Sequence, residues 1–299
     1  ISKPRPIDGV FCFKKLIIMK ISIIGTGLIG GSIALKLKDK KFTDFVYGID
    51  QDEVHLTKAL ELNIIDEKAD LENGVKNSDL IIIAIPVDSA RKILPSVLDL
   101  INENQTVMDV GSTKSGIVES IKDHPNRKRF VAFHPMWGTE NSGPKSATKE
   151  SFAGKAAVIC NREDSDSDAL AIVEKVIENL EMHPIYMNAD SHDVHTAYIS
   201  HISHITSYAL ANTVLEKERE EDTILQLASS GFSSTVRLAK SHPEMWVPIF
   251  RQNKENVLDV LNEHITQLRK FKSALEKENF DYLEELIVNA NKIRGILDK

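Results

Sequence analysis

GTGLIGGS, at residues 25–32, stands where a short apolar run ends and a helical pattern begins. The run before it, Lys20–Gly25, is rich in β-branched residues and ends in glycine, which predicts a buried strand. The pattern after it continues from Leu28 to about Lys40 and predicts a helix. A glycine-rich turn between strand and helix is typical of a dinucleotide-binding loop. The stretch therefore predicts the first unit of a sheet domain that binds a cofactor.

Each glycine of this loop has its own physical role. Gly25 permits the tight turn, Gly27 lets a pyrophosphate approach the backbone, and Gly30 lets the helix pack closely on the strand. Asp50 ends the second predicted strand, 20 residues beyond Gly30. A carboxylate there accepts hydrogen bonds from a ribose 2′-hydroxyl and repels a 2′-phosphate. The combination favours NAD over NADP, and a glycine turn that serves packing alone is the alternative.

Strands and helices alternate over the N-terminal half of the chain. The further apolar runs that predict strands are Phe45–Asp50, Leu80–Ile85, Thr106–Gly111, Phe130–Pro135, Lys155–Cys160 and His183–Met187. The helical patterns between them lie near Asp52–Leu62, Ser89–Leu100, Ile117–His124 and Ser167–Met182. Such alternation predicts an α/β domain of the Rossmann type, whose mostly parallel sheet is covered on both faces.

The strand pattern stops at Asp190, and helical patterns fill the rest of the chain. We expect a Rossmann domain over residues 19–188 and an all-α domain over residues 189–299. Residues 1–18 are expected to be an extension outside the fold, because Met19 stands directly before the first strand.

Two segments of these domains have a distinctive pattern. In Asn253–Lys277 the apolar residues fall near heptad spacing. This spacing fits either a helix in the core of its own domain or a seam between two subunits. The polar segment Asn141–Ser151 predicts a mobile surface loop.

Composition and charge exclude several classes of function. The net charge of -7 argues against nucleic acid as a partner, because neutralising phosphates requires a basic surface. The longest apolar run, Leu80–Val87, is too short to span a membrane and contains Pro86. Cys12 and Cys160 are far apart and stand in no ligand spacing. This usage fits a reducing compartment and predicts a cytoplasmic protein.

Two polar clusters follow predicted strands, at the sheet edge where open α/β folds bind their ligands. In DVGSTKS (residues 109–115), Ser112 is placed to bond a nicotinamide or a catalytic group, although it also fits a helix N-cap. In FHPMWGTE (residues 133–140), His134 closes a strand before proline and glycine. A histidine there can take a proton from a hydroxyl while hydride leaves the same carbon. A structural histidine is the alternative.

The order of these motifs resembles that in prephenate dehydrogenases, the TyrA family. The loop GTGLIGGS, DVGSTKS and HPMWGTE are followed by SHISH (residues 200–204) and GFSSTVRLAKSHPEMW (residues 231–246). The resemblance covers nearly the whole chain from Met19. It implies a Rossmann domain followed by a helical dimerisation domain, and hence a homodimer. It also implies NAD(P)-dependent oxidative decarboxylation of prephenate to 4-hydroxyphenylpyruvate, a step towards tyrosine.

The resemblance implies roles for particular residues. His134 matches the catalytic histidine that bonds the ring hydroxyl, and Ser112 a serine that orients this histidine and the nicotinamide. Arg237 matches an arginine that holds a substrate carboxylate. The residues matched to the substrate pocket are Ser200, His201, His204, Arg237 and Trp246. The residues expected to bind the cofactor are Gly25, Gly27, Leu28, Ile29, Gly30, Asp50, Pro86 and Ser112.

The sequence departs from the family pattern at two positions. Trp137 stands where many members have a small residue, so we expect the loop after His134 to pack differently. Ser234 stands where many members carry an acid. We therefore expect the guanidinium of Arg237 to be free of a competing carboxylate.

The other histidines need separate treatment. Those without a family role, expected on the surface or in packing, are His183, His192 and His195. A metal site formed by His192, His195, His201 and His204 is the alternative, but no acid or cysteine completes a zinc pattern, so we expect no metal. We expect protonated His201 and His204 to strengthen binding of a dianion, and activity to fall at low pH as His134 is protonated.

Three other functions stay open. Arogenate dehydrogenase differs only in a substrate amino group, and no acidic residue can be assigned to an ammonium. A 3-hydroxyacid dehydrogenase would place a catalytic lysine on the helical domain, where this chain has a histidine pair and Arg237. A non-enzymatic dimer that senses NAD is the third.

Overall fold

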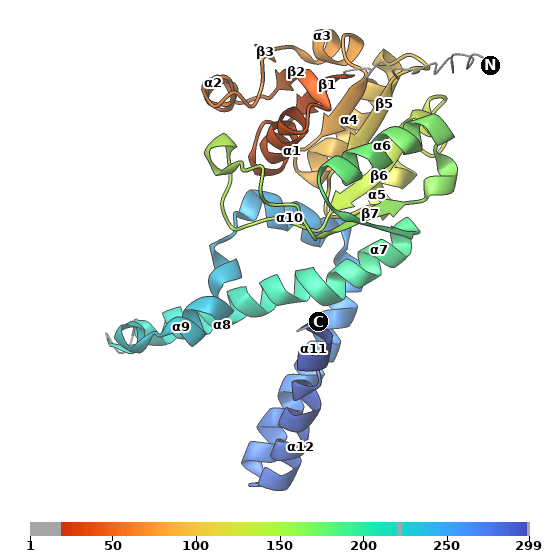
Figure 1. The fold of residues 1–299 in the computed structure, drawn as a ribbon. Coiled ribbons are helices and arrows are strands. Elements are labelled where there is room, and N and C mark those ends of the chain that lie inside the picture. The colour runs from red at the N-terminus through yellow and green to blue at the C-terminus, as the bar shows by residue number, and fades with distance from the viewer. Residues whose placement is uncertain (1–18, 220–222, 298–299) are drawn as a thin grey trace, which may run out of the picture.

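The protein, as a computed structural model, is described over residues 19–219 and 223–297. Its N-terminal part is an eight-stranded sheet in the order β3-β2-β1-β4-β5-β6-β7-β8 (Figure 1). Neighbouring strands run parallel except for β6 and β7, which are antiparallel. The strands are β1 (Met19–Ile24), β2 (Thr43–Ile49), β3 (Glu67–Lys68), β4 (Leu80–Ile83), β5 (Thr106–Asp109), β6 (Phe130–Pro135), β7 (Ala156–Cys160) and β8 (His183–Met187).

Helices cover both faces of this sheet, because its central strands carry apolar side chains on both sides. In β1, Ile23 belongs to one buried core and Ile24 to the other. One face is covered by α1 (Leu28–Asp39), α2 (Glu53–Glu61) and α6 (Ser167–Asn179). The other is covered by α3 (Leu71–Lys76), α4 (Val87–Leu100) and α5 (Ser115–Glu119). The predicted Rossmann-type fold is confirmed.

The sequence pattern missed two short elements and overestimated a third. β3 has only 2 residues and α3 only 6, too few for either period to appear in the pattern. Helix α5 ends at Glu119 instead of extending to His124. None of these differences changes the order of the sheet or the edge at which the motif residues emerge.

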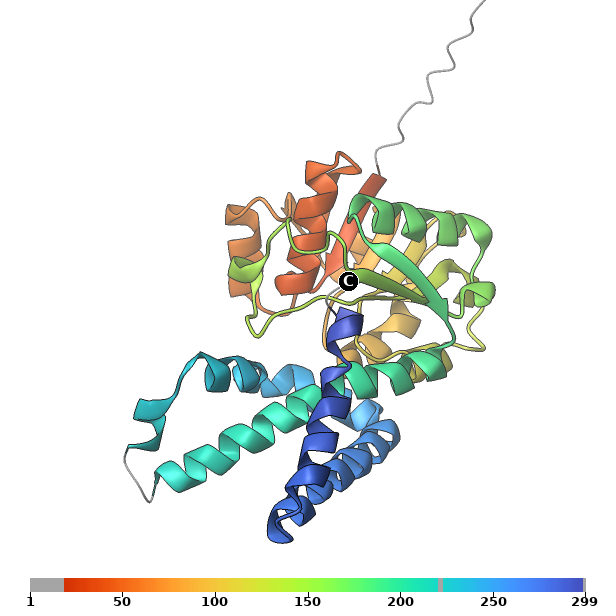
Figure 2. The same cartoon turned by 60° about the horizontal axis from the view of Figure 1, so that its bottom comes forward.

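The C-terminal part is helical, as expected. It consists of α7 (Ala189–Thr196), η4 (Ala197–His201), α8 (Ile202–Glu218), η5 (Ile224–Leu227), α9 (Ser230–Thr235), η6 (Arg237–Lys240), α10 (Pro243–Gln252), α11 (Lys254–Glu276), α12 (Phe280–Asn291) and α13 (Arg294–Leu297). Helix α8 leaves the sheet domain in one direction, and the α11–α12 pair leaves it in another (Figures 1 and 2). They form two separate arms.

The expectation that residues 1–18 form an extension outside the fold concerns residues that the structure does not describe. These residues include Cys12. In the part that is described, none of the helices combines the length and the apolar character needed to cross a bilayer.

Candidate active site

The glycine loop has the shape that a dinucleotide requires. Gly25 has a φ of 98°, and its N–H donates to the carbonyl of Ile49 at 2.8 Å. A Cβ on Gly30 would lie 2.2 Å from the carbonyl oxygen of Gly25, so only glycine allows this packing. A Cβ on Gly27 would meet no atom within 4 Å, which leaves open space in front of α1. Because Gly27 caps α1 without a side-chain bond, the first N–H groups of the helix are available to a phosphate.

The other residues expected at the cofactor lie around this loop. Leu28 and Ile29 open α1 and are partly buried. Asp50 follows β2, with its side chain 15% exposed. Pro86 is the N-cap of α4. Ser112 follows β5 and is partly buried, but within the described residues it makes no hydrogen bond to His134.

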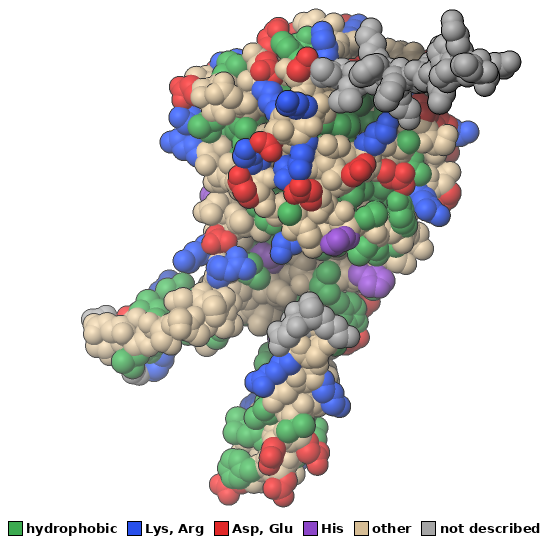
Figure 3. Space-filling model, in the orientation of Figure 1, with side chains coloured by type: hydrophobic (Ala, Val, Ile, Leu, Met, Phe, Trp, Pro, Cys, Tyr) green, Lys and Arg blue, Asp and Glu red, His purple; other side chains and the backbone are tan. Residues whose placement is uncertain are grey.

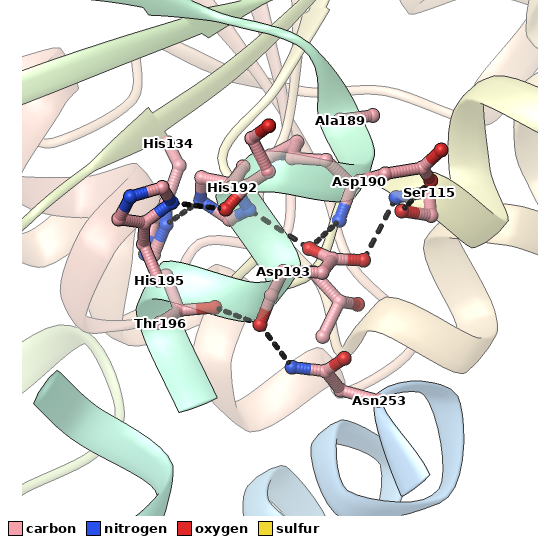
Figure 4. A network of polar contacts seen from close by, with 12 residues as sticks. Ser115, His134, Ala189, Asp190, His192, Asp193, His195, Thr196 and Asn253 are labelled. Carbon is pink, nitrogen blue, oxygen red and sulfur yellow. Dashed lines mark hydrogen bonds and ion pairs between the residues drawn. The ribbon is translucent and has the colours of Figure 1, made fainter. Parts of the chain in front are cut away.

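A chain of hydrogen bonds links His134 to the helical part (Figure 4). Nδ1 of His134 lies 2.8 Å from Nε2 of His192, and Nδ1 of His192 lies 2.8 Å from a carboxylate oxygen of Asp193. The same carboxylate accepts the backbone N–H groups of Lys114 and Ser115 at 2.8 and 2.9 Å. His192 was expected on the surface or in packing; the structure shows it buried and hydrogen-bonded to His134, so a surface position is wrong.

The direction of these bonds follows from the donor and acceptor groups. The carboxylate of Asp193 can only accept, so Nδ1 of His192 carries a hydrogen. Nε2 of a neutral His192 is then an acceptor, and Nδ1 of His134 donates to it. This assignment leaves Nε2 of His134 with a lone pair. The chain thus holds His134 in the tautomer that a general base needs.

Burial keeps the histidines of the site uncharged. It lowers the pKa of His134 well below its usual value, and positive charge on His192 or Lys114 lowers it further. Burial also lowers the pKa of His192 and of His204, and it lowers the pKa of His201 to about 4. Burial therefore opposes the positive charge expected on His201 and His204 and favours their neutral forms.

A π-helical turn, η4, positions the SHISH motif. In a regular helix of about 100° per residue, His201 would lie about 180° around from His192. A π-helical turn contains about one residue more than an α-helical turn. This extra residue brings His201 back to within about 80° of His192 around the helix axis. His201 and His204 are both buried and both face Trp246 of α10, with ring centroids 5.9 Å and 3.4 Å away. Trp246 also packs on Val87, at the start of α4.

The partners of these two histidines assign them different tautomers. The Asn253 amide lies 3.1 Å from Nδ1 of His201 and donates to it, so Nε2 of His201 carries the hydrogen. Nδ1 of His204 donates to the carbonyl of Ser200 at 3.1 Å, so Nε2 of His204 is an acceptor. Neutral His201 can donate to a substrate carboxylate, whereas neutral His204 cannot.

Arg237 already has an acidic partner. Its guanidinium donates to the carboxylate of Glu140 at 2.9 Å, and the positive charge of Arg237 lowers the pKa of nearby His204. The expectation that Arg237 lacks a competing carboxylate is therefore wrong. Ser234 is neutral, but Glu140, the last residue of HPMWGTE, takes the place of the missing acid.

The segment after Glu140 is tied to both parts of the molecule. Ser142 contacts the His242 ring at 3.1 Å, and the N–H of Thr148 donates to the Ser32 hydroxyl on α1 at 2.9 Å. Trp137 packs edge-on against fully buried Phe152, with ring centroids 4.9 Å apart. These contacts place an apolar anchor at the end of the segment that the sequence predicted to be a mobile surface loop.

The structure thus brings together most of the predicted catalytic and substrate residues. His134 meets the helical part through His192, and Arg237, His204 and Trp246 are neighbours. Sequence reasoning missed His192, Asp193, Glu140 and Asn253. His183 and His195 are exposed, and the hydrogen bond of the His195 ring goes to the carbonyl of Ser191. In the described ranges no group of three or more His, Cys, Asp or Glu is arranged to hold a metal ion.

Comparison with known proteins gives a family for both halves. Residues 33–186 match the family model "Prephenate dehydrogenase, nucleotide-binding domain", and residues 188–289 match "Prephenate dehydrogenase, dimerization domain". The prephenate dehydrogenase of Bacillus subtilis is 31% identical over 277 residues, which is 92% of this chain and 75% of that protein.

Solved structures show the same relationship. The prephenate dehydrogenase of Aquifex aeolicus, in complex with hydroxyphenyl propionate and NAD+, superposes with a TM-score of 0.84 at 30% identity. The match covers 94% of this chain and 100% of that one. A Synechocystis arogenate dehydrogenase matches with a TM-score of 0.74 at 27% identity, over 93% of this chain and 99% of that one.

Proposed function

Because the chain belongs to the prephenate dehydrogenase family and is an NAD-dependent oxidoreductase, we propose that His134 is its base in the oxidative decarboxylation of prephenate to 4-hydroxyphenylpyruvate. The observation that carries this proposal is the chain from His134 through His192 to Asp193. It frees Nε2 of a buried, neutral histidine at the carboxyl edge of the sheet, on the same edge as the glycine loop.

NAD, when bound, supplies the acceptor for the hydride that leaves the ring carbon. The residues placed to hold it are the glycine loop, the first N–H groups of α1, and Asp50 at the ribose. Ser112 and Pro86 emerge from the same sheet edge and are proposed to border the nicotinamide.

The proton balance explains why a buried base is suitable. Prephenate bears a hydroxyl and a hydrogen on the same ring carbon, and His134 accepts the hydroxyl proton as that carbon becomes a carbonyl. When carbon dioxide leaves and the ring becomes aromatic, the electrons return to this oxygen, which takes the proton back as a phenol. No proton has to reach the solvent. His134 holds it only briefly, while Asp193, acting through His192, stabilises the positive charge.

The two substrate carboxylates need cations or donors. Arg237 is proposed to bind one of them, exchanging Glu140 for the substrate. The pair is partly exposed, and exposed pairs are worth about 0–1 kcal/mol, so this exchange costs little. Nε2–H of His201 is proposed as a further donor, whereas His204 stacks on Trp246 and fixes the pocket wall. Ser200, whose carbonyl orients His204, is proposed to line the same pocket.

We propose further that the chain forms a cytoplasmic homodimer through its helical domain, residues 189–299. The heptad leucines Leu258, Leu268 and Leu275 of α11 are 42%, 55% and 57% exposed within one chain. Apolar side chains also lie on the surface of the α11–α12 arm (Figure 3). Exposed leucines along one helix favour a seam between subunits rather than a helix in the core of its own domain. Buried, unpaired Cys160 supports a reducing compartment.

The deciding experiment follows NADH formation with prephenate and with arogenate, each tested with NAD and with NADP. We expect turnover with prephenate and NAD. His134→Asn should abolish most of it while leaving NAD affinity unchanged, because the base acts in the transition state. Turnover with arogenate alone would favour the arogenate alternative. Binding of NAD without turnover of either substrate would leave the non-enzymatic alternative.

A further inference from the structure

We infer that Thr26, between the first two glycines of the coenzyme loop, is a positioning residue that holds Asp50 for the coenzyme ribose and sharpens the preference for NAD over NADP. The inference rests on the proposed function for the role of Asp50. It assigns to Thr26 a task that the loop motif leaves open, because the motif specifies only the glycines on either side.

The geometry of the turn places two donors of one residue on one carboxylate oxygen. The backbone N–H of Thr26 lies 2.9 Å from Oδ2 of Asp50, and the Thr26 hydroxyl lies 3.0 Å from the same atom. The Thr26 side chain is fully buried, so no water competes for its hydroxyl. Oδ1 of Asp50 accepts the N–H of Asp52 at 3.0 Å.

These three bonds leave Asp50 with little freedom. A carboxylate has about four acceptor positions, and three of them are filled from within the protein. The fourth lies on Oδ1, and the side chain remains 15% exposed. The carboxylate is therefore fixed in place with one position open for a ribose hydroxyl. His55 of α2, 3.9 Å from Oδ2, is the other titratable group beside it.

A fixed carboxylate discriminates between coenzymes better than a mobile one. The 2′-hydroxyl of NAD donates a hydrogen bond, whereas the 2′-phosphate of NADP brings negative charge to the same place. A side chain free to rotate would move away from the phosphate and reduce the repulsion. The buried Thr26 hydroxyl opposes that rotation, since rotation would leave it without its acceptor.

The test replaces the hydroxyl by a methyl group of similar size. For Thr26→Val we expect the Kd for NAD, measured by titration without substrate, to rise about tenfold, which corresponds to about 1.4 kcal/mol. The Kd for NADP should change less, so the NAD:NADP preference should fall. Thr26→Ser keeps the hydroxyl and should keep both affinities.

A double-mutant cycle separates positioning from packing. In an Asp50→Ala background, Thr26→Val should have little further effect on NAD binding, because residue 50 then has no side-chain acceptor for the Thr26 hydroxyl. A tenfold loss that persists in that background, or an unchanged coenzyme preference in Thr26→Val, would overturn the inference. If Thr26→Val does not fold, Thr26→Ala takes its place in the same cycle. Because binding is measured without substrate, a failure to oxidise prephenate would count against the proposed function alone.

Discussion

His192 is the residue through which His134 is hydrogen-bonded to the helical part of the molecule. It lies between His134 and Asp193 and is 1% exposed. Its position in the chain gave no signal, since a histidine at a helix start is usually an exposed or packing residue. A possible signal was the pair His192-Asp193 itself, because an imidazole beside a carboxylate is the usual way to fix a catalytic tautomer.

Removing His192 should impair chemistry more than binding. In His192→Ala we expect kcat to fall about 10–100-fold, the usual effect of removing the partner of a functional histidine, with the KM for NAD nearly unchanged. The acid limb of kcat/KM should move to higher pH, because His134 becomes less buried and burial is the main cause of its lowered pKa. Steady-state kinetics against pH measures both effects.

His192→Gln provides the matched control. Its side-chain oxygen can accept from Nδ1 of His134, so part of kcat should return. A kcat in His192→Ala equal to that of the parent, with the acid limb in place, would show that His192 only fills space.

Helix α7, the π-helical turn η4 and helix α8 form one continuous element, and here prediction from sequence was only partly successful. Helical patterns were expected from Asp190 onward, and this element begins at Ala189 and ends at Glu218. The turn inside it was not predicted, because π-helical turns result from tertiary contacts and leave no periodic signal. Without that turn the sequence places His192 and His201 on different faces.

The buried histidines of this element, together with His134 on β6, should make the stability of the protein sensitive to acid. Burial lowers the pKa of His134, His192, His201 and His204, so below about pH 6.5 the unfolded chain takes up protons that the folded chain does not. The stability that these neutral histidines contribute is therefore fully present above about pH 6.5 and is lost as the pH falls. For His201 the loss continues down to about pH 4. Each of these histidines changes the free energy of unfolding by up to about 1.4 kcal/mol per pH unit. Thermal unfolding between neutral pH and pH 5 should show a steep fall in Tm.

A pair of variants tests the source of this sensitivity. His201→Gln should make the fall in Tm shallower, because one buried titrating group is gone. His183→Gln, an exposed position on β8, should leave it unchanged. Equal slopes in both variants and the parent would place the acid sensitivity outside the buried histidines.

At the scale of the whole molecule, the sequence predicted the sheet well and the relation between the two halves poorly. The strands of the sheet were predictable because they are apolar runs bounded by turns, such as Leu80–Ile83. The bridges between the halves were not predictable, because they join residues far apart in the chain. Examples are Asp88 with Gln252 at 2.8 Å and Thr113 with Gln252 at 2.9 Å. Periodicity carries no information about such pairs.

The last prediction concerns the α11–α12 arm. The heptad spacing on α11 fits either a helix in the core of its own domain or a seam between two subunits. In one chain, Val257 and Val260 are buried, whereas Leu268 and Leu275 are more than half exposed. Leu261 and Ile265 of the heptad are partly buried, so the C-terminal part of the heptad face is the part that its own chain leaves uncovered, as a subunit seam requires. In a two-fold dimer each substitution acts twice, so Leu268→Glu with Leu275→Glu places four carboxylates in the seam. Losing about 1 kcal/mol of apolar burial per leucine, together with the cost of burying charge, should weaken the dimer more than 100-fold.

Sedimentation velocity over a concentration series measures this change. We expect the parent to sediment as a dimer and the double variant as a monomer. Leu62→Glu is the matched control: Leu62 is 39% exposed, but it lies at the end of α2 in the coenzyme domain and should leave the dimer intact. A double variant that remains dimeric at the lowest concentration would assign the exposed leucines to some other contact and the seam to a different face of the arms. Loss of the dimer in both variants would mean that added charge weakens association regardless of where it is placed.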